Sequence, residues 1–258
     1  MKKILTKMFS VTLVLLMVLC LVPPVEAQAS SRTVNLSNNK WYTNNSSSRQ
    51  TVYHRIKVSK PGYITLSGNG IGVWSPKTSL RYNLTNNKKK NLTNIKFLPD
   101  SPSNYTGRKA FTDHFAVKKG TYYIKVTDSR YRLKYKFTAS KDQSGASKAK
   151  AKNIGRGKTA KGLLIAGEKG GKSDWFKFTL PRAQKIKLTF NSRANDWVQY
   201  KLVPANSRIS ITGASSHTWA KKLSGTTRSV FPAGTYYIQV TRMSKDKNTS
   251  GYYTVSWK

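Results

Sequence analysis

The chain has 258 residues, of which 47 are Lys or Arg and 9 are Asp or Glu, so its formal net charge at pH 7 is +38. Such an imbalance attracts polyanions and opposes compaction through self-repulsion, whereas basic residues that merely solvate a surface are normally mixed with acidic ones. The single cysteine, Cys20, lies in an apolar segment near the N-terminus, which excludes a framework of disulfides.

Residues 1–29 have the pattern of a secretory signal peptide. Three lysines precede an apolar run over residues 11–22, and cleavage is predicted after Ala27 or Ala29. The run is short for a permanent anchor, so the mature chain is predicted to hold no integral membrane segment, with an uncleaved signal anchor as the alternative. Cleavage would leave 44 basic and 8 acidic residues, a net charge of +36. The sequence therefore predicts a secreted, extracellular protein that charge could retain at a cell surface.

The remainder of the chain is predicted to contain two similar units. A polar segment rich in Asn and Ser, residues 30–48, leads into a first repeat over residues 49–140. Residues 141–152 (KDQSGASKAKAK) are small and basic without apolar alternation, which predicts a linker. The second repeat covers residues 153–258.

The two repeats share a pattern of side chains that fits a β-sheet. Residues 53–66 (YHRIKVSKPGYITL) align without a gap with residues 175–188 (WFKFTLPRAQKIKL), and GTYYIKVT at 120–127 recurs as GTYYIQVT at 234–241. Apolar and polar residues alternate in these segments, as in strands with one buried face.

The last strands of the repeats are expected to align Tyr135 and Phe137 with Tyr253 and Val255. About seven or eight short strands in each repeat are typical of an antiparallel sandwich. The predicted fold is therefore all-β, with two tandem antiparallel β-sandwich domains of the jelly-roll or Greek-key kind after the signal peptide.

Three segments of the second repeat consist of core aromatics and a turn before a strand: SDWFKFTL (173–180), PAGTYYIQV (232–240) and GYYTVSW (251–257). They resemble the bacterial pre-peptidase C-terminal (PPC) domain family. Two tandem copies are predicted. The second is the clearer, because in the first repeat Val52 and Tyr53 replace the Asp-Trp pair. The resemblance implies a secreted β-sandwich, often appended to extracellular enzymes, that helps to bind insoluble or cell-surface material. Because a fold does not determine function, it assigns no ligand.

Patterns for catalysis and metal binding are missing from the sequence. The histidines, His54, His114 and His217, have no metal-ligand spacing, and His54 falls on an inward strand position that predicts a packed residue. Nucleophile motifs and Gly-rich phosphate loops are absent, and the eight acids of the mature chain are scattered, whereas glycoside hydrolysis needs paired carboxyl groups. The sequence predicts no enzyme, no cofactor and no metal site.

Basic residues occupy outward positions on several predicted strands. They are Arg55, Lys57, Lys125, Lys134 and Lys136 in the first repeat and Lys177, Lys185 and Lys187 in the second. Because side chains two apart share a sheet face, these residues predict basic stripes that could hold an extended polyanion. Aromatic residues predicted on the outer face by alternation are Tyr63, Tyr123, Tyr131, Tyr237 and Tyr252, with Trp41 in an irregular segment and lysine-rich loops at 88–90 and 148–161. Lysine beside an aromatic ring suits sugar stacking or the binding of anionic glycans.

Three functions are compatible with the sequence. The leading hypothesis is a secreted, strongly cationic, non-catalytic binding or adhesion protein that associates with anionic polymers or glycans, such as teichoic acid, of the cell envelope, host mucus or matrix. The alternatives are an extracellular nucleic-acid-binding protein, which lacks a recognisable nucleic-acid motif, and a carbohydrate-active enzyme or peptidase accessory.

Overall fold

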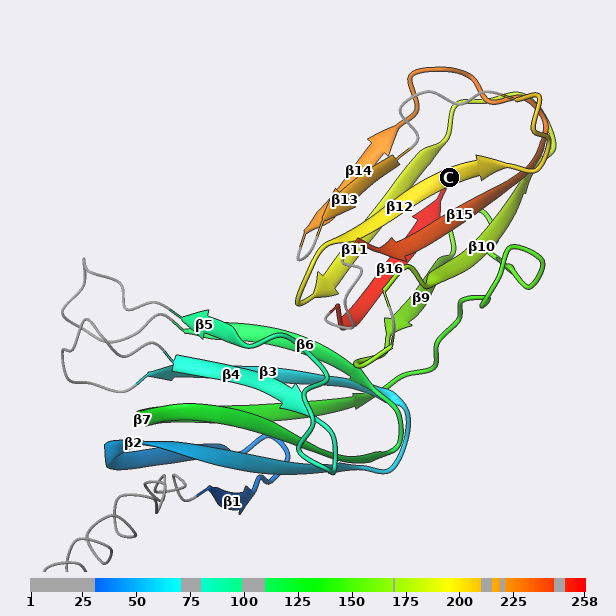
Figure 1. Cartoon of the computed structure of the whole chain (residues 1–258). Helices are drawn as coiled ribbons and strands as arrows, with labels where there is room; N and C mark the ends of the chain where they lie inside the picture. Colours follow the sequence, from blue (N-terminus) through cyan, green and yellow to red (C-terminus); the bar gives the residue numbers. More distant parts are fainter. Residues whose placement is uncertain are drawn as a thin grey trace, which may run out of the picture. The chain divides into compact units, whose positions relative to one another are not determined.

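Strands make up all the regular structure that is described (Figure 1). The computed structural model describes residues 31–70, 80–98, 110–168, 170–209, 215–218, 221–243 and 249–258. These ranges contain sixteen strands and no helix, which confirms the all-β prediction. No membrane-spanning helix is found in the same ranges. The predicted signal peptide lies outside them.

One sheet contains all the strands that are described before residue 140. They are β1 (Arg32–Asn35), β2 (Trp41–Val58), β3 (Gly62–Gly70), β4 (Leu80–Thr85), β5 (Lys96–Leu98), β6 (Phe111–Val117) and β7 (Gly120–Ala139). Residues 50–58 of β2 pair with 120–128 of β7, and after an irregularity in register residues 41–45 pair with 130–134. Strand β4 joins the first part of β7 and β3 joins the second part.

The long strands β2 and β7 therefore carry this sheet around a corner and divide it into two layers. Layer one contains β1, the second part of β2, the first part of β7, β4 and β5, and layer two contains the remaining parts with β3 and β6. Apolar residues of both layers, such as Leu84 and Ile124 from layer one and Leu66 and Phe115 from layer two, form one buried cluster. We call strands β1–β7 the first sandwich.

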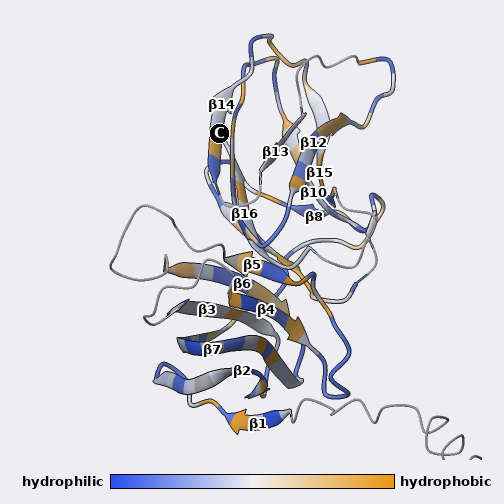
Figure 2. Ribbon diagram, turned by 60° about the vertical axis from the view of Figure 1, so that its left-hand side comes forward, coloured by the Kyte–Doolittle hydropathy of each residue, from blue (hydrophilic) through white to orange (hydrophobic). Residues whose placement is uncertain are grey.

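The second sandwich is built from two separate sheets. Its strands are β8 (Lys152–Asn153), β9 (Thr159–Leu164), β10 (Ser173–Leu180), β11 (Lys187–Ala194), β12 (Val198–Pro204), β13 (Ser215–Thr218), β14 (Lys222–Thr226), β15 (Gly234–Arg242) and β16 (Gly251–Trp257). One sheet has the order β13-β12-β15-β10-β8 and the other β14-β11-β16-β9. Phe178 stacks on Trp257 across the core with ring centroids 4.5 Å apart. Apolar and polar residues alternate along strands of both sandwiches (Figure 2), as the sequence predicts.

The strand registers show that the two sandwiches have one topology. In the first sandwich Thr51 pairs with Thr127, and in the second the aligned residues Ser173 and Thr241 pair with each other. Strands β10 and β15 therefore correspond to the layer-one parts of β2 and β7. Strand β8 runs parallel to β10 as β1 runs parallel to β2. Strands β9 and β16 likewise correspond to the layer-two parts of β2 and β7.

The predicted alignment of the last strands is wrong by four residues. Leu66 pairs with Tyr135, and the aligned residue Leu188 pairs with Trp257, so Tyr135 corresponds to Trp257. Four residues earlier, Tyr131 therefore corresponds to Tyr253. The reason is that β7 continues without interruption, whereas residues 243–250 separate β15 from β16.

Two segments that the sequence sets apart from the repeats lie along the sheets. Strand β1 and the first part of β2 fall within residues 30–48, predicted to be a polar lead-in. In the predicted linker, Gln143 N donates to Lys161 O at 2.9 Å, and Gly145 exchanges two backbone hydrogen bonds with Trp175. Backbone pairing, to which Asn and Ser contribute as well as any residue, extends the sheets into segments that lack apolar alternation. The domain boundaries themselves stay a prediction.

The two sandwiches meet through layer two of the first and the β9–β16 sheet of the second. Ala166 N donates to Ala116 O at 2.9 Å, and Ala116 N donates to the Ser250 hydroxyl at 3.0 Å. On the outer faces nearby, the rings of Tyr63 from β3 and Tyr252 from β16 stack with centroids 4.1 Å apart.

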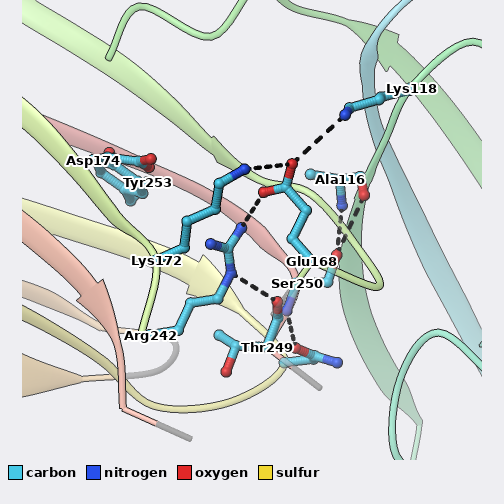
Figure 3. Close-up of polar contacts among 10 residues, drawn as sticks. Ala116, Lys118, Glu168, Lys172, Asp174, Arg242, Thr249, Ser250 and Tyr253 are labelled. Atoms are coloured by element: carbon cyan, nitrogen blue, oxygen red, sulfur yellow. Dashed lines mark hydrogen bonds and ion pairs between the residues drawn. The ribbon is translucent and has the colours of Figure 1, made fainter. Parts of the chain in front are cut away.

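A carboxylate lies in the same junction. Figure 3 shows Glu168 between Lys118 of the first sandwich and Lys172 and Arg242 of the second. Its oxygens lie 3.6 Å from Lys118 Nζ, 3.1 Å from Lys172 Nζ and 3.3 Å from Arg242 Nη2. The Arg242 side chain is 1% exposed, so Glu168 neutralises a buried guanidinium.

Candidate polyanion-binding surface

Three of the predicted basic residues share the outer face of layer one. On β2, Arg55 lies between the buried residues His54 and Ile56, and Lys57 lies between Ile56 and Val58, so both point outward. Lys125 of β7 lies between buried residues and pairs with Tyr53 of β2. These three residues therefore share one outer face, and their role in binding stays a prediction.

Lys134 and Lys136 lie on a different face, because they follow the corner in β7. Both belong to the part of the strand that forms layer two. Lys134 pairs with Trp41 of the neighbouring strand β2, and its Nζ lies 4.9 Å from the Trp41 ring centroid.

The remaining three predicted residues are divided between the two sheets of the second sandwich. Lys177 is exposed on β10, Lys187 is exposed at the start of β11, and Lys185 is exposed just before that strand. The eight predicted residues therefore lie on four sheet faces and do not form one continuous stripe.

Tyr131, predicted to point outward, is buried with no exposed surface. Even-numbered residues of β7 point inward up to Asp128, and odd-numbered residues point inward from Tyr131 onward. The irregularity at the corner shifts the alternation by one residue, and this shift reverses the faces of all later side chains. Tyr131 instead lies 2.7 Å from His54 Nε2 in the core, and burial lowers the pKa of His54 to about 3.

An aromatic pair with a lysine marks the outer face of layer one. The rings of Tyr53 and Tyr123 pack edge to face, with centroids 6.1 Å apart at 88°. Lys89 Nζ lies 4.4 Å from the Tyr53 centroid, within the range of a cation–π contact. Lys89 is held in a tight turn in which its amide donates to Asn86 O at 2.9 Å.

The second sandwich presents the same combination on the outer face of its β10–β15 sheet. Trp175 and Tyr237 pack edge to face, with centroids 6.3 Å apart at 81°. Lys148 Nζ lies 4.9 Å from the Tyr237 centroid. Lys148 belongs to the segment that the sequence predicts to be a linker, and the two hydrogen bonds between Gly145 and Trp175 fix this segment beside the site.

Further exposed aromatic residues on the first sandwich also have cationic neighbours. Trp41 is 48% exposed, and the guanidinium carbon of Arg132 lies 4.8 Å from its ring centroid. Phe97 of β5 is 56% exposed, and the guanidinium carbon of Arg81 lies 5.2 Å from its centroid. Basic and aromatic side chains are thus interleaved on both layers of this sandwich.

Several acids are engaged inside the protein. Asp113 accepts hydrogen bonds from Tyr82 at 2.7 Å and Lys96 at 2.9 Å. Asp174 accepts a 2.7 Å hydrogen bond from Tyr253, and its pKa is raised to about 6 by burial, with a further contribution from the charge of Asp142. Among the described residues no three His, Cys, Asp or Glu side chains are grouped so as to hold a metal ion.

The most specific contacts of the site were missed by sequence reasoning. Lys89 and Lys148 lie in loops that the sequence marks only as lysine-rich, and Arg132 was not singled out. A run of lysines indicates positive charge, but which lysine lies over a ring depends on turns that bring separate segments together.

Similar solved structures are β-rich domains of diverse origin. The pre-peptidase C-terminal domain of a collagenase from Bacillus anthracis has 21% identity and a TM-score of 0.34, covering 42% of this chain and 94% of that one. The CBM22-1-CBM22-2 tandem domain of Paenibacillus barcinonensis Xyn10C has 10% identity and a TM-score of 0.28, covering 83% and 82%. The CUB1-EGF-CUB2 domain of human MASP-1/3 has 8% identity and a TM-score of 0.24, covering 85% and 99%.

No protein-family model and no curated protein matches the chain. The collagenase domain belongs to the family that the second repeat resembles in sequence. A match over 42% of the chain does not extend to two tandem copies, which stay a prediction. At these identities and TM-scores, the similarities assign neither a ligand nor an activity.

Proposed function

We propose that this chain is a secreted, non-catalytic binding protein whose positive surface holds anionic polymers or glycans of the cell envelope, host mucus or matrix. The observation that carries the proposal is the contrast between the two signs of charge. Lysines and arginines stand on the outer faces of both sandwiches, whereas Asp113, Asp174 and Glu168 are turned toward partners within the protein.

Asp113 and Asp174 therefore add little negative charge to the outer faces, whereas Glu168 also pairs with the exposed Lys118 and Lys172. A formal net charge of +38 for the whole chain would be weakened at the surface if acids were mixed among the lysines. Instead, the Glu168 carboxylate neutralises the buried Arg242, and the buried Asp113 carboxylate bonds Lys96 and Tyr82. Outward residues such as Arg55, Lys57 and Lys177 therefore contribute their charge to the field outside the protein.

The aromatic neighbours of these cations favour a ligand with apolar as well as charged parts. Trp41 and Phe97 remain about half exposed although arginines cover part of their surface. An exposed aromatic ring beside a cation can contact the C–H groups of a sugar while the cation binds its acidic group.

Binding to immobilised anionic polymers at two ionic strengths tests the proposal. We expect retention on teichoic acid or an acidic glycan at 50 mM NaCl and release at about 500 mM NaCl, because salt screens exposed charges beyond a few ångströms at high concentration. Retention that survives high salt and is released by a neutral sugar would contradict the proposal, as would failure to bind any polyanion at low salt.

A further inference from the structure

We propose that the chain is bivalent: each sandwich carries a site of the same kind, an aromatic pair across two strands with a lysine over one of the two rings, and both sites bind one linear acidic polysaccharide. The first site is Tyr53, Tyr123 and Lys89, and the second is Trp175, Tyr237 and Lys148. This inference rests on the proposed function and specifies its ligand and its residues.

The aromatic pairs occupy equivalent positions in the two sandwiches. His54 pairs with Ile124 in the first sandwich, and Phe176 pairs with Ile238 in the second. The residue before each of these places Tyr53 at the position of Trp175, and Tyr123 at the position of Tyr237. The two pairs have nearly the same geometry, 6.1 Å at 88° and 6.3 Å at 81°. Equivalent strands therefore present equivalent pairs on their outer faces.

The lysines, in contrast, come from segments that do not correspond. Lys89 lies in the turn between β4 and β5, whereas Lys148 lies in the segment before β8. They also cover different members of the pair: Lys89 lies over Tyr53, whereas Lys148 lies over Tyr237, which corresponds to Tyr123. The lysines are therefore not explained by the repeat in the strands. The combination of ring pair and ammonium is what the two sandwiches have in common.

Both lysines are positioned by constrained backbone. Lys89 has a φ of +59°, a left-handed conformation that is costly for a residue with a side chain and that is found preferentially at functional sites. In the second site, Gly145 approaches the backbone of Lys150 so closely that a β-carbon would overlap its carbonyl. This close turn carries Lys148, while Gly145 pairs with Trp175.

The chemistry of the site matches a sugar acid. An ammonium over a ring keeps N–H donors for a carboxylate or sulfate, and the neighbouring ring edges and hydroxyls offer contacts to sugar C–H and hydroxyl groups. Lys89 and Lys148 each cover a face of an aromatic ring that a nucleobase would need for stacking. The arrangement therefore favours an acidic polysaccharide over a single-stranded nucleic acid.

The aromatic pairs lie on strands other than those that contribute Ala116, Tyr63 and Tyr252 to the junction. The sandwiches meet through layer two and the β9–β16 sheet, where Tyr63 stacks on Tyr252. The aromatic pairs lie on layer one and on the β10–β15 sheet. One polymer that contacts both sites gains from the high effective concentration of the second site, typically a factor of about 100 or more.

Polygalacturonate, a linear glycan with one carboxylate on each sugar, tests the inference together with its trimer. We expect the full-length protein to bind the polymer about 100-fold more tightly than the trimer. Either Lys89→Ala or Lys148→Ala should abolish most of this preference, and the double variant should weaken polymer binding by at least about tenfold per lysine, as loss of a charge-assisted hydrogen bond predicts. The matched control is Lys60→Ala with Lys158→Ala, which removes one exposed lysine near each sandwich.

The outcomes separate this inference from the proposed function. Equal losses in the control and in the Lys89/Lys148 variant would show diffuse attraction and overturn the two sites while leaving polyanion binding intact. Tight binding of poly(dT) or polyglutamate with no binding of polygalacturonate would overturn the ligand class alone. Failure to bind any of these polymers at low salt would overturn both proposals.

Discussion

His54 Nε2 lies 2.7 Å from the hydroxyl of Tyr131 in the core of the first sandwich, and the two rings meet at 89°. Phe176 and Tyr253 occupy the equivalent positions in the second sandwich and also meet at 89°. Phenylalanine has no acceptor, and there the tyrosine hydroxyl donates to Asp174 at 2.7 Å. The two cores thus satisfy one buried hydroxyl with different titratable groups, and their pH dependence should have opposite signs.

The first sandwich should lose stability as the solution becomes acidic. Burial holds the pKa of His54 at about 3 in the folded state, below the ordinary value of 6.5, so the unfolded chain binds more protons between these values. The stability contributed by neutral His54 is present above pH 6.5 and should fall by about 2 kcal/mol by pH 5. Hydrogen exchange of β2 and β7 amides at pH 7.5 and pH 5, corrected for intrinsic rates, measures the effect.

The variant His54→Gln is the control for this effect, since it retains an acceptor for Tyr131 and does not titrate. It should flatten the pH dependence of the first sandwich. A wild-type protein whose β2 and β7 protection is the same at both pH values would contradict the prediction.

The second sandwich should respond in the opposite direction. The folded pKa of Asp174, raised to about 6 from 3.8 chiefly by burial, makes the native state bind more protons than the unfolded chain between these values. Its contribution to stability is therefore complete below pH 3.8 and is lost as the pH rises through 6, by up to about 3 kcal/mol. Protection of β10 and β16 amides between pH 4 and pH 7 should show this decline, and Asp174→Asn should remove it.

Lys89→Gly should separate stability from binding in the first site. Glycine adopts a φ of +59° without steric cost, which should raise the free energy of unfolding by roughly 1–2 kcal/mol. The greater freedom of glycine in the unfolded chain should lower it again by about 0.5–1 kcal/mol. We expect an unchanged or slightly higher midpoint of thermal unfolding together with weaker polygalacturonate binding. In the adjacent control Lys88→Gly, which removes the same charge without a ring contact, binding should be nearly unchanged. Equal binding losses in both variants would argue against a special role for Lys89.

Glu168→Gln should destabilise the second sandwich and the junction. The substitution removes the carboxylate that lies 3.3 Å from Arg242 Nη2, while Nη1 of this buried guanidinium already lacks a hydrogen-bond partner. An uncompensated buried charge typically costs about 3–5 kcal/mol. Chemical denaturation should show a loss of this size, whereas Lys118→Ala, at a side chain that is 68% exposed, should cost less than about 1 kcal/mol. Similar small effects in both variants would refute the assignment.

The strand content and the facing of many side chains could be predicted from the sequence. Residues such as Phe176, Phe178 and Leu180 alternate with polar neighbours, and this local pattern correctly places them in a core. His54 was correctly predicted to point inward by the same alternation. The shared segments also predicted two similar units, because equivalent strands need equivalent inward positions.

The prediction of inward and outward side chains was wrong where the alternation along a strand shifts by one residue. Tyr131 follows the corner of β7, where a one-residue irregularity exchanges the inward and outward faces, and no residue type in that segment marks the change. Lys134 and Lys136 lie beyond the same corner, so they occupy a different layer from Lys125 of the same strand.

The sequence by itself determined the sign and amount of charge, the strand-forming segments and most of the core, because these depend on composition and on the two-residue period of a strand. Only the tertiary structure decided which cations meet which rings. Lys89 reaches Tyr53, and Lys148 reaches Tyr237, through turns and pairings between residues far apart in the chain. Such contacts depend on the pairing of distant strands, which the local pattern of residues does not encode.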